Sequence, residues 1–461
     1  MAPTEPVHVI LNYKPDDTIA ALATPPGRGA VAIIRLSGTQ ARAIGKQLTG
    51  VEPEARRAYL CEFRDEDSHP IDRGLLLYFP GPRSFTGEDV VELHGHGGMV
   101  VSDMLLAGAL RLGARAAEPG EFTLRAFLND KLDLTQAEGI ADLVNSGSRK
   151  AARAAYRSLD GRFSALVEEL QKNLTALRVE LEVWLDFPDE ELALNEMTDL
   201  EHSFDRAIVA LETVLSQARE GAVLNNGLTV VIAGPPNAGK SSLMNRLSGY
   251  DAAIVTSIPG TTRDALREQL SIDGLPVTVI DTAGLRNSAD PVELEGMRRA
   301  HRALESADLL IWVTDCRSEL ASDLGEVRGL AGQDTAVAVI QNKVDLIADE
   351  PARLEKDGVT VIRMSALTGQ GMQLLSEHLK MVAGYRSDAA GTFSARTRHI
   401  DALQRAGRDI REARLQLVDT LAIEIAADEL RSAQAALSEV TGELTSDDLL
   451  GEIFSSFCIG K

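Results

Sequence analysis

The sequence predicts a multidomain protein: an N-terminal α+β domain, a central helical domain, and an α/β domain with a phosphate-binding P-loop inserted into the helical domain. Three observations predict it. Strand-like apolar runs alternate with glycine turns near the N-terminus, and helical periodicity occupies the chain on both sides of its middle. Between the two helical stretches, an apolar strand leads into a glycine-rich loop and a helix. We therefore place the domains at residues 1–131, 132–224, 225–388 and 389–461, the second and fourth being halves of the helical domain.

The N-terminal domain is predicted from short apolar runs that are separated by turn residues. Two strands are expected at 18–23 and 30–36, and two more at 74–79 and 89–93. A longer apolar stretch at 99–112 predicts a helix. Strands followed by a helix favour an α+β domain.

The helical domain is predicted from the period of its apolar residues. From Leu132 onward, one helix face is marked at i, i+3, i+4 and i+7 by Ala137, Ile140, Ala141 and Val144. Another helix is expected at 198–220, and helical periodicity returns over 395–450. Because both ends of the inserted domain join helices, its motion can be transmitted to them.

The P-loop prediction rests on the spacing Gly234-x4-Gly239-Lys240-Ser241, which follows the apolar strand 229–232 and precedes an apolar-periodic helix. Glycines let backbone N–H groups approach phosphate oxygens, and the helix N-terminus adds partial positive charge. Lys240 is expected to reach the β- and γ-phosphates, and the Ser241 hydroxyl to ligate Mg²⁺. The alternative is a plain glycine turn, which the motifs downstream argue against.

Four later motifs identify the nucleotide. Gly260-Thr261-Thr262 offers hydroxyls for Mg²⁺ and the γ-phosphate, and strand 277–280 ends in Asp281-Thr282-Ala283-Gly284. The next strands end in Asn342-Lys343-Val344-Asp345 and in Ser365-Ala366. A carboxylate at Asp345 can accept hydrogen bonds from N1–H and the amine of guanine, whereas adenine offers neither donor there. The sequence therefore predicts a GTPase.

The expected GTP contacts come from all five motifs. They are Asn237, Ala238, Gly239, Lys240, Ser241, Ser242, Thr256, Ser257, Ile258, Pro259, Gly260, Thr261, Thr262, Asp281, Thr282, Ala283, Gly284, Asn342, Lys343, Asp345, Ser365 and Ala366.

Composition limits the partners and the compartment. A net charge of −22 argues against a protein that itself grips nucleic acid through a broad basic face. Three distant cysteines form neither a disulfide framework nor a zinc motif, which suits a reducing cytoplasm. No apolar run reaches the roughly 18 residues that a membrane helix needs, and we expect no signal peptide.

Three stretches outside the GTPase motifs have distinctive sequences: ALATPPGRGAVAIIRLSG at 21–38, SFTGEDVVELHGHGG at 84–98 and EPGEFTLRAFLNDKLDLTQAEGIADL at 118–143. These stretches resemble the MnmE (TrmE) family of tRNA modification GTPases. The resemblance includes the GTPase motifs and the final residues Phe457-Cys458-Ile459-Gly460-Lys461, so it covers essentially the whole chain.

The resemblance implies a folate site and a set of partners. In the family, the N-terminal domain binds 5-formyltetrahydrofolate or a related folate and forms a homodimer. The matching positions here are Arg35, Glu92, Lys131 and Lys461. A partner of the MnmG (GidA) type, which contains FAD, is expected to hold most of the tRNA. Together such proteins modify C5 of the wobble uridine, with the carbon coming from the folate.

The resemblance also implies how GTP is hydrolysed. Leu285 follows Gly284, where small GTPases carry a glutamine that orients water. In related potassium-activated GTPases, the asparagine at the position of Asn237 ligates K⁺, and Thr256, Ile258 and Thr261 would add oxygens. Such an ion offsets charge between the β- and γ-phosphates. A turn-stabilising role for Asn237 is the alternative.

The expected catalytic residues are therefore Glu293, Asn237, Lys240 and Thr262, with Mg²⁺ held by Ser241 and Thr262. Glu293 matches the family's water-orienting position, although Glu295 is nearby and either carboxylate could serve.

Two other functions remain open. A regulatory GTPase of ribosome assembly would carry a basic RNA-binding module, and none is evident in the sequence. A folate-dependent aminomethyl transferase that merely carries a GTPase would keep modifying tRNA without GTP hydrolysis. The role of Cys458, as a reactive thiol or a small apolar group, is also open.

Overall fold

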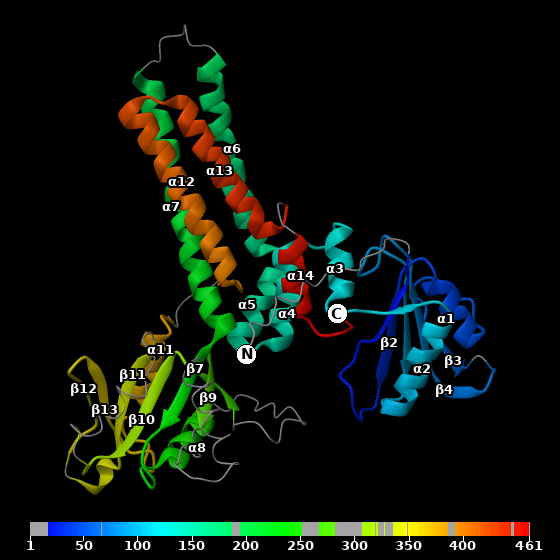
Figure 1. Cartoon of the computed structure of the whole chain (residues 1–461), viewed down its shortest axis with the longest axis horizontal. Helices are drawn as coiled ribbons and strands as arrows, with labels where there is room; N and C mark the ends of the chain where they lie inside the picture. Colours follow the sequence, from blue (N-terminus) through cyan, green and yellow to red (C-terminus); the bar gives the residue numbers. More distant parts are fainter. Residues whose placement is uncertain are drawn as a thin grey trace, which may run out of the picture. The chain divides into compact units, whose positions relative to one another are not determined.

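The computed structural model describes residues 17–65, 67–186, 194–250, 267–281, 307–318, 320, 327, 335–347, 349–385, 392–443 and 447–460. The chain divides into an N-terminal unit, Met1–Ala141 with Ala435–Lys461, and a central unit, Asp142–Gln434. Figure 1 shows their helices and strands. Among the described residues, no helix combines the length and apolar character needed to cross a membrane.

The N-terminal unit is built on a six-stranded sheet. Its strand order is β3-β4-β5-β2-β1-β6, antiparallel except for the β1–β6 pair. The strands are β1 Ile19–Leu22, β2 Ala32–Ser37, β3 Tyr59–Arg64, β4 Pro70–Phe79, β5 Val90–Gly95 and β6 Arg115–Ala116. Helices α1 (Ala41–Thr49) and α2 (Met99–Arg111) bury Ile44 and Leu105 in the same core as the strands.

A second core in this unit is helical. It joins α3 (Glu121–Leu128) and the start of α4 (Leu134–Asn145) to α14 (Asp447–Ser455). Phe454 and Phe127 pack with ring centroids 6.3 Å apart. Residues near the C-terminus therefore complete the fold of the N-terminal unit.

The central unit contains a bundle of long helices (Figure 1). They are α6 Arg162–Asp186, α7 Leu194–Asn226, α12 Thr397–Thr420 and the first part of α13 Ile423–Thr441, whose last residues belong to the N-terminal unit. The shorter helix α5 Arg149–Leu159 also belongs to the central unit. Buried leucines repeat along α6 at helical spacing: Leu170, Leu174, Leu177 and Leu181. This repeat supplies the apolar stripe that buries α6 against its neighbours.

The nucleotide-type domain of this unit is a seven-stranded sheet of order β12-β13-β11-β10-β7-β9-β8. Its strands are β7 Leu228–Ala233, β8 Arg267–Ile272, β9 Leu275–Asp281, β10 Leu309–Asp315, β11 Ala336–Asn342, β12 Ala352–Lys356 and β13 Val359–Arg363. The inner five strands are parallel, and the edge strands β8 and β12 are antiparallel to their neighbours. Helices α8 (Lys240–Tyr250) and α11 (Met372–Val382) and the 3-10 turn η1 (Val344–Leu346) complete the described part.

Strand β7 shows why this sheet is buried on both faces. Val230 and Ile232 lie in one apolar cluster, while Val231 and Ala233 lie in another. Successive side chains of a strand point to opposite faces, so an uninterrupted apolar run predicts a central parallel strand.

The predicted multidomain fold class, with its α+β, helical and P-loop α/β parts, is confirmed. Helix α1 and strand β3 were not predicted. Gly45 lowers the helical character of α1 in the sequence, yet a Cβ there would lie 2.9 Å from Cγ1 of Val91. The glycine lets the helix pack closely on β5. The four domain boundaries given above stay a prediction.

Candidate functional site

The loop after β7 has a backbone that two glycines make possible. Gly234 has φ 139°, and a Cβ there would lie 2.1 Å from the carbonyl oxygen of Val313 in β10. Gly239 has φ 101°, and Asn237 takes the left-handed conformation at φ 60°, which asparagine tolerates. The loop then enters α8 at Lys240. Its N–H groups at the helix N-terminus form the kind of anion site that phosphates occupy.

Lys240 places a positive charge inside this loop. Its Nζ donates to the carbonyl oxygens of Gly234 at 2.8 Å and Pro235 at 2.9 Å. Ser241 and Ser242 follow in the first turn of α8, where both are exposed. The ammonium group and the hydroxyls therefore come from adjacent residues at one helix end.

Asn342 ties three loops together. This buried residue at the end of β11 donates from Nδ2 to the carbonyl oxygen of Ala238 at 2.8 Å. Its Oδ1 accepts from the backbone N–H of Ala366 at 2.9 Å. A Cβ at Gly239 would lie 2.2 Å from Asn342 Nδ2, so the loop packs directly on this amide. One side chain thus fixes the loops that follow β7 and β13 relative to β11.

The other residues that are predicted to contact the guanine base differ in exposure. Asp345 is exposed at η1, whereas Ser365 and Ala366 are buried after β13. Lys343 has φ 69°, and its Nζ lies 3.0 Å from Oδ2 of Asp315. Hydrogen bonds from Arg317 and Lys343 outweigh burial and hold the pKa of the Asp315 carboxyl well below its usual range. The exposed carboxylate of Asp345 is therefore available to a ligand beside an anchored loop.

The order of the strands explains why these loops meet. After β7 the chain forms β8 and β9 on one side of it and then β10 on the other. In open parallel sheets, ligands bind at the carboxyl ends of the strands where the order reverses in this way. Loops after β7, β11 and β13 lie at that edge.

Part of the predicted site lies outside the described residues. This holds for Thr256, Ser257, Ile258, Pro259, Gly260, Thr261, Thr262, Thr282, Ala283, Gly284, Glu293 and Lys461, and for the side chain of Asp281. The described oxygens fit hard cations: a serine hydroxyl at Ser241 and an exposed asparagine amide at Asn237. The roles given to these residues stay predictions.

A second group of predicted residues lies in the N-terminal unit. Arg35 in β2 pairs in register with Glu92 in β5, and Arg35 Nε donates to Glu92 Oε1 at 2.9 Å. His94 Nε2 lies 2.9 Å from Glu92 Oε2. Burial raises the pKa of the Glu92 carboxyl, but the hydrogen bond with His94 and the charge of Arg35 outweigh it, so that this pKa lies below its ordinary value. Glu92 is thus held ionised.

The same arginine reaches the C-terminal residues. Its Nη1 donates to the carbonyl oxygen of Gly460 at 3.4 Å, and its guanidinium lies 5.7 Å and 5.8 Å from the ring centroids of Phe85 and Phe122. A Cβ on Gly460 would lie 2.5 Å from the carbonyl oxygen of Leu22, so this segment packs tightly against the end of β1. Gly460, the residue before Lys461, therefore contacts Arg35.

Lys131 is linked to the other predicted folate-binding residues only indirectly. Its side chain is exposed, and its Cγ would lie 3.4 Å from a Cβ on Gly87. Gly87 belongs to the segment between β4 and β5 that also carries Phe85, beside Arg35. The structure thus links Lys131 to the other predicted residues through this segment.

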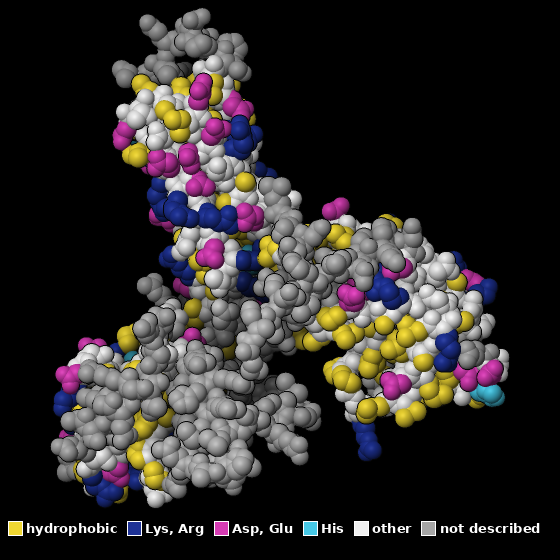
Figure 2. Space-filling model, in the orientation of Figure 1, with side chains coloured by type: hydrophobic (Ala, Val, Ile, Leu, Met, Phe, Trp, Pro, Cys, Tyr) yellow, Lys and Arg dark blue, Asp and Glu magenta, His cyan; other side chains and the backbone are white. Residues whose placement is uncertain are grey.

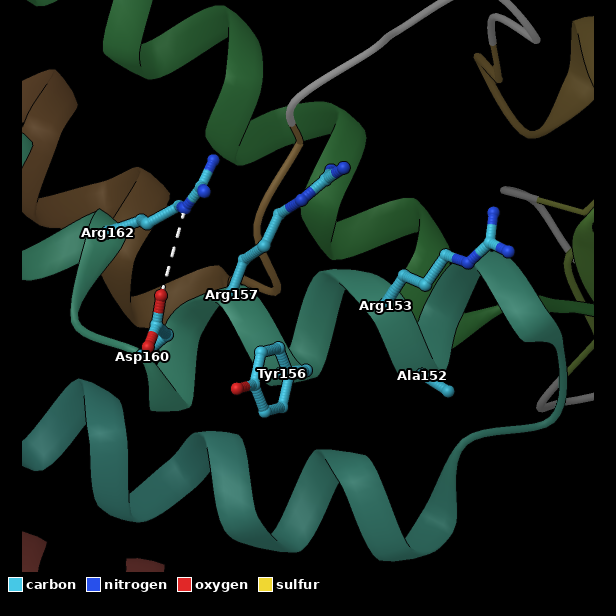
Figure 3. Close-up of a pocket in the computed structure, with 6 residues that line it drawn as sticks. All are labelled: Ala152, Arg153, Tyr156, Arg157, Asp160 and Arg162. Atoms are coloured by element: carbon cyan, nitrogen blue, oxygen red, sulfur yellow. Dashed lines mark ion pairs between the residues drawn. The ribbon is translucent and has the colours of Figure 1, made fainter.

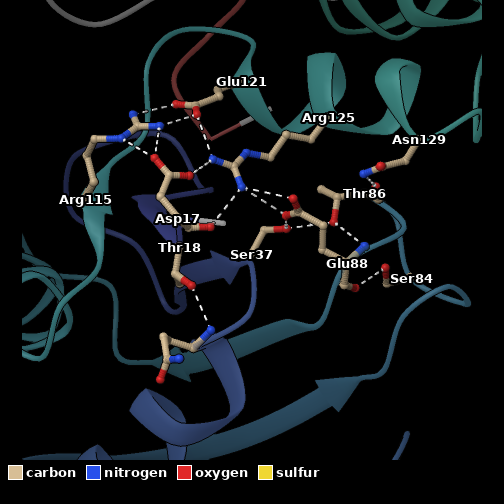
Figure 4. A network of polar contacts seen from close by, with 11 residues as sticks. Asp17, Thr18, Ser37, Ser84, Thr86, Glu88, Arg115, Glu121, Arg125 and Asn129 are labelled. Carbon is tan, nitrogen blue, oxygen red and sulfur yellow. Dashed lines mark hydrogen bonds and ion pairs between the residues drawn. The ribbon is translucent and has the colours of Figure 1, made fainter. Parts of the chain in front are cut away.

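A buried ion cluster holds that segment, and sequence reasoning missed it (Figure 4). Arg125 in α3 is fully buried. Its guanidinium donates to Glu88 Oε1 and Glu121 Oε1, both at 3.0 Å, and pairs with Asp17. An arginine four residues after a glutamate usually indicates a surface pair on a helix. No pattern in the sequence distinguishes this one.

Hydrogen bonds extend from the cluster to the segment. Ser37 Oγ donates to Glu88 Oε2 at 2.6 Å and lies 2.7 Å from Thr86 Oγ1. Asn129 Nδ2 donates to the carbonyl oxygen of Thr86 at 2.7 Å. These contacts fix the residues that directly follow Phe85, which in turn faces Arg35.

Comparison with known proteins agrees with both units. Residues 134–458 match the model of the MnmE helical domain, and residues 18–131 match that of the GTP-binding protein TrmE N-terminus. The tRNA modification GTPase MnmE of Nitrosococcus oceani is 52% identical over 445 residues, covering 96% of this chain and 97% of that protein. The protein of the same name from Stutzerimonas stutzeri is 52% identical over 450 residues, covering 96% of this chain and 99% of the relative. This chain belongs to the MnmE (TrmE) family of tRNA modification GTPases.

Proposed function

We propose that this chain is a K⁺-activated GTPase that modifies C5 of the wobble uridine of certain tRNAs in the cytoplasm. It acts as a homodimer with an FAD-containing partner of the MnmG type and takes a carbon from a tetrahydrofolate. The observation that carries the proposal is that Asn342 ties the P-loop to the loop after β13, in a chain 52% identical to named tRNA modification GTPases.

GTP is bound across the carboxyl edge of the seven-stranded sheet. The phosphates lie against the loop Gly234–Ser241, and Lys240 neutralises part of their charge. Guanine reaches the exposed carboxylate of Asp345, which accepts from two donors of the base. Asp345→Asn should shift preference from GTP to XTP, because the C2 carbonyl of xanthine accepts from an amide. An unchanged preference would remove Asp345 from the base pocket.

Hydrolysis uses residues from the loop and from the segments after it. Ser241 and Thr262 hold Mg²⁺, and Glu293 orients the attacking water in place of the glutamine that Leu285 replaces. Asn237, with Thr256, Ile258 and Thr261, holds K⁺, whose charge stabilises the transition state.

Folate is bound in the N-terminal unit. The pterin of a folate presents an amide-like edge of N–H donors, which suits the ionised carboxylate of Glu92. The negative glutamyl tail suits Arg35, Lys131 and Lys461. The contact between Arg35 and Gly460 supports a site that includes the C-terminal residues.

The test is nucleoside analysis of tRNA from a strain that lacks this chain. Loss of the wobble modification, restored by the wild-type chain and not by Lys240→Ala, is the expected result. Normal modification without the chain would overturn the proposal. Turnover of GTP in K⁺ and in Na⁺ tests the cation separately, since the smaller ion should fit poorly and equal rates would remove the K⁺ role.

A further inference from the structure

Helix α5 (Arg149–Leu159) is strongly basic, although the whole chain carries a net charge of −22. It contains Arg149, Lys150, Arg153 and Arg157 and no acidic residue, and Arg162 follows shortly after it. Lys150 is directed to the nucleotide-type domain, where its Nζ lies 3.0 Å from the hydroxyl of Tyr385. The other arginines need a separate explanation.

These arginines lie on the outer face of the helix. The inner face is buried through Ala151, Ala154, Ala155 and Ser158. Arg149, Arg153 and Arg157 follow at four-residue spacing, so neighbours lie about 6 Å apart along the axis. Like charges at this spacing destabilise a helix unless an anion lies between them.

Acidic partners are scarce on this face. Arg153 forms no ion pair or hydrogen bond with any residue in the described part of the chain, and Arg157 donates only to the carbonyl oxygen of Thr392, at 3.0 Å. Arg162 is 64% exposed, and its Nε lies 4.0 Å from Asp160 Oδ2. Its charge is therefore only partly balanced.

Several basic residues on the other helices lie in ion pairs with acidic residues. Lys172 pairs with Glu168, Arg411 with Glu212, and Arg431 with Asp428. Figure 2 shows acidic and basic side chains interleaved along the long helices. The outer face of α5 departs from this pattern, which points to a ligand that supplies the negative charge.

The face also has a hollow and an aromatic ring. An open pocket of about 370 Å³ is lined by Ala152, Arg153, Tyr156, Arg157, Asp160 and Arg162. Figure 3 shows Arg153 and Arg157 projecting from α5 and Arg162 from the start of α6, with the ring of Tyr156 directed away from the three arginines in this view. Tyr156 is 57% exposed, so its ring is accessible to a ligand.

We infer that this face of α5, together with Arg162, binds the phosphate backbone of RNA, with Tyr156 stacking on an unpaired base. The inference rests on the proposed function and names the tRNA as the RNA. Arginine forks match phosphate oxygens, and single-stranded RNA loops present bases to aromatic rings. Carboxylates of an acidic protein would satisfy the arginines but would leave the exposed ring without a matching group, so RNA is favoured. The chain thus holds part of the tRNA itself, beyond what the partner holds.

The test uses the full-length chain and one purified tRNA, with binding followed by fluorescence anisotropy. Arg153→Gln combined with Arg162→Gln should weaken binding about tenfold and lower the slope of log Kd against log salt by about one to two. Tyr156→Ala should also weaken it by about tenfold, while Tyr156→Phe should bind like the wild type, because stacking needs only the ring. GTP turnover should stay unchanged in all of these variants, since none of the three residues lies in the nucleotide site.

The matched control is Lys172→Gln combined with Arg431→Gln, which removes the same charge from α6 and α13, where both residues are exposed. Its tRNA affinity should stay within about twofold of the wild type. Equal losses in both double variants would overturn the inference, and so would no measurable tRNA binding by the wild type. Loss of binding to the MnmG-type partner with tRNA binding intact would assign the face to a protein instead.

The two proposals fail differently. If the strain that lacks the chain keeps its wobble modification, the proposed function fails. If that strain loses the modification and the α5 variant restores it with wild-type tRNA affinity, only the present inference fails.

Discussion

The nucleotide loop and the N-terminal charge pair are built on opposite principles. The loop is made of backbone groups, shaped by glycines and held by one uncharged amide, Asn342. The N-terminal site is made of charged side chains, Arg35 and Glu92, and a nearby cluster of ion pairs is centred on the fully buried Arg125. An added methyl group should therefore disrupt the nucleotide loop, whereas removal of a charge should disrupt the N-terminal site.

The difference follows from what each proposed ligand would require. A triphosphate offers many oxygens, which a ring of N–H groups can bind without the desolvation that several buried cations would require. A pterin edge offers few groups, so one carboxylate fixed in place gives more selectivity. Fixing it requires further charges, and these have to be satisfied in the interior.

Removing the central charge of the N-terminal cluster should give the largest effect. Arg125→Met leaves Asp17, Glu88 and Glu121 without their shared partner, and breaking a buried pair in this way costs about 3–5 kcal/mol. Hydrogen exchange of β2 and β5 should report this loss, with β10 and β11 unchanged. Arg64→Met is the control, because Arg64 is 47% exposed in its pair with Glu62 and should matter by less than about 1 kcal/mol. A loss below that in Arg125→Met would mean that the cluster is not needed for the fold.

Acid should destabilise the two units over different ranges of pH. His378 in α11 is buried, and burial together with the charge of Arg353 lowers its pKa from 6.5 to about 4. The unfolded chain protonates this ring below pH 6.5 while the folded domain does not. The nucleotide-type domain should therefore lose about 2 kcal/mol between pH 6.5 and 5 and about 3 by pH 4.

The N-terminal cluster should respond only in stronger acid. Burial raises the pKa values of Asp17 and Glu121, but hydrogen bonds from Arg115 and Arg125 outweigh it and hold both below their ordinary 3.8 and 4.5. Their contribution is complete above those values and is lost as pH falls below them.

The His378 prediction is tested on the central domain. Urea unfolding followed by Trp312 fluorescence, in a Trp184→Phe background, measures its stability at pH 7 and 5. His378→Leu should abolish most of the difference, and an equal loss in that variant would assign it to other groups.

A single methyl group should disable the nucleotide loop. In Gly239→Ala, the Cβ would lie 2.2 Å from Asn342 Nδ2, at a φ of 101° that alanine disfavours. Asn342 would have to move, and the N–H groups would lose their alignment with the phosphates. GTP affinity should fall about a hundredfold, as expected for one or two lost bonds to a charged group. Gly249→Ala in α8 is the control, since its Cβ meets nothing within 4 Å. Wild-type affinity in Gly239→Ala, measured with a fluorescent GTP, would show that Asn342 does not clamp the loop.

The loop and the charge pair also differ in how well they could be predicted from the sequence. The loop is local, so its glycines, Lys240 and Ser241 stand together in the chain and could be found from spacing alone. Arg35 and Glu92 lie on different strands and meet only through the register of β2 and β5, so a resemblance to a family was needed to find them. Arg125 resembles any helical surface arginine until the fold buries it. The basic run of α5 is visible in the sequence, but its shortage of acidic partners depends on the fold.

The smallest expected effect concerns Glu92, where size can be kept and only the charge removed. A carboxylate accepts from two donors of a pterin, whereas the amide in Glu92→Gln accepts from one and sets an N–H₂ against the other. It also leaves Arg35 and His94 without the charge that they now share. Affinity for 5-formyltetrahydrofolate, measured by calorimetry, should fall about tenfold, within the range for a hydrogen bond to a charged group. Glu62→Gln is the control: Glu62 lies in β3 of the same sheet, is 51% exposed and pairs with Arg64. GTP turnover should be equal in both variants, because no described nucleotide-site residue contacts this pair. Wild-type folate affinity in Glu92→Gln would place the folate elsewhere, and the Arg35–Glu92 pair would then serve only to fix the register of β2 against β5.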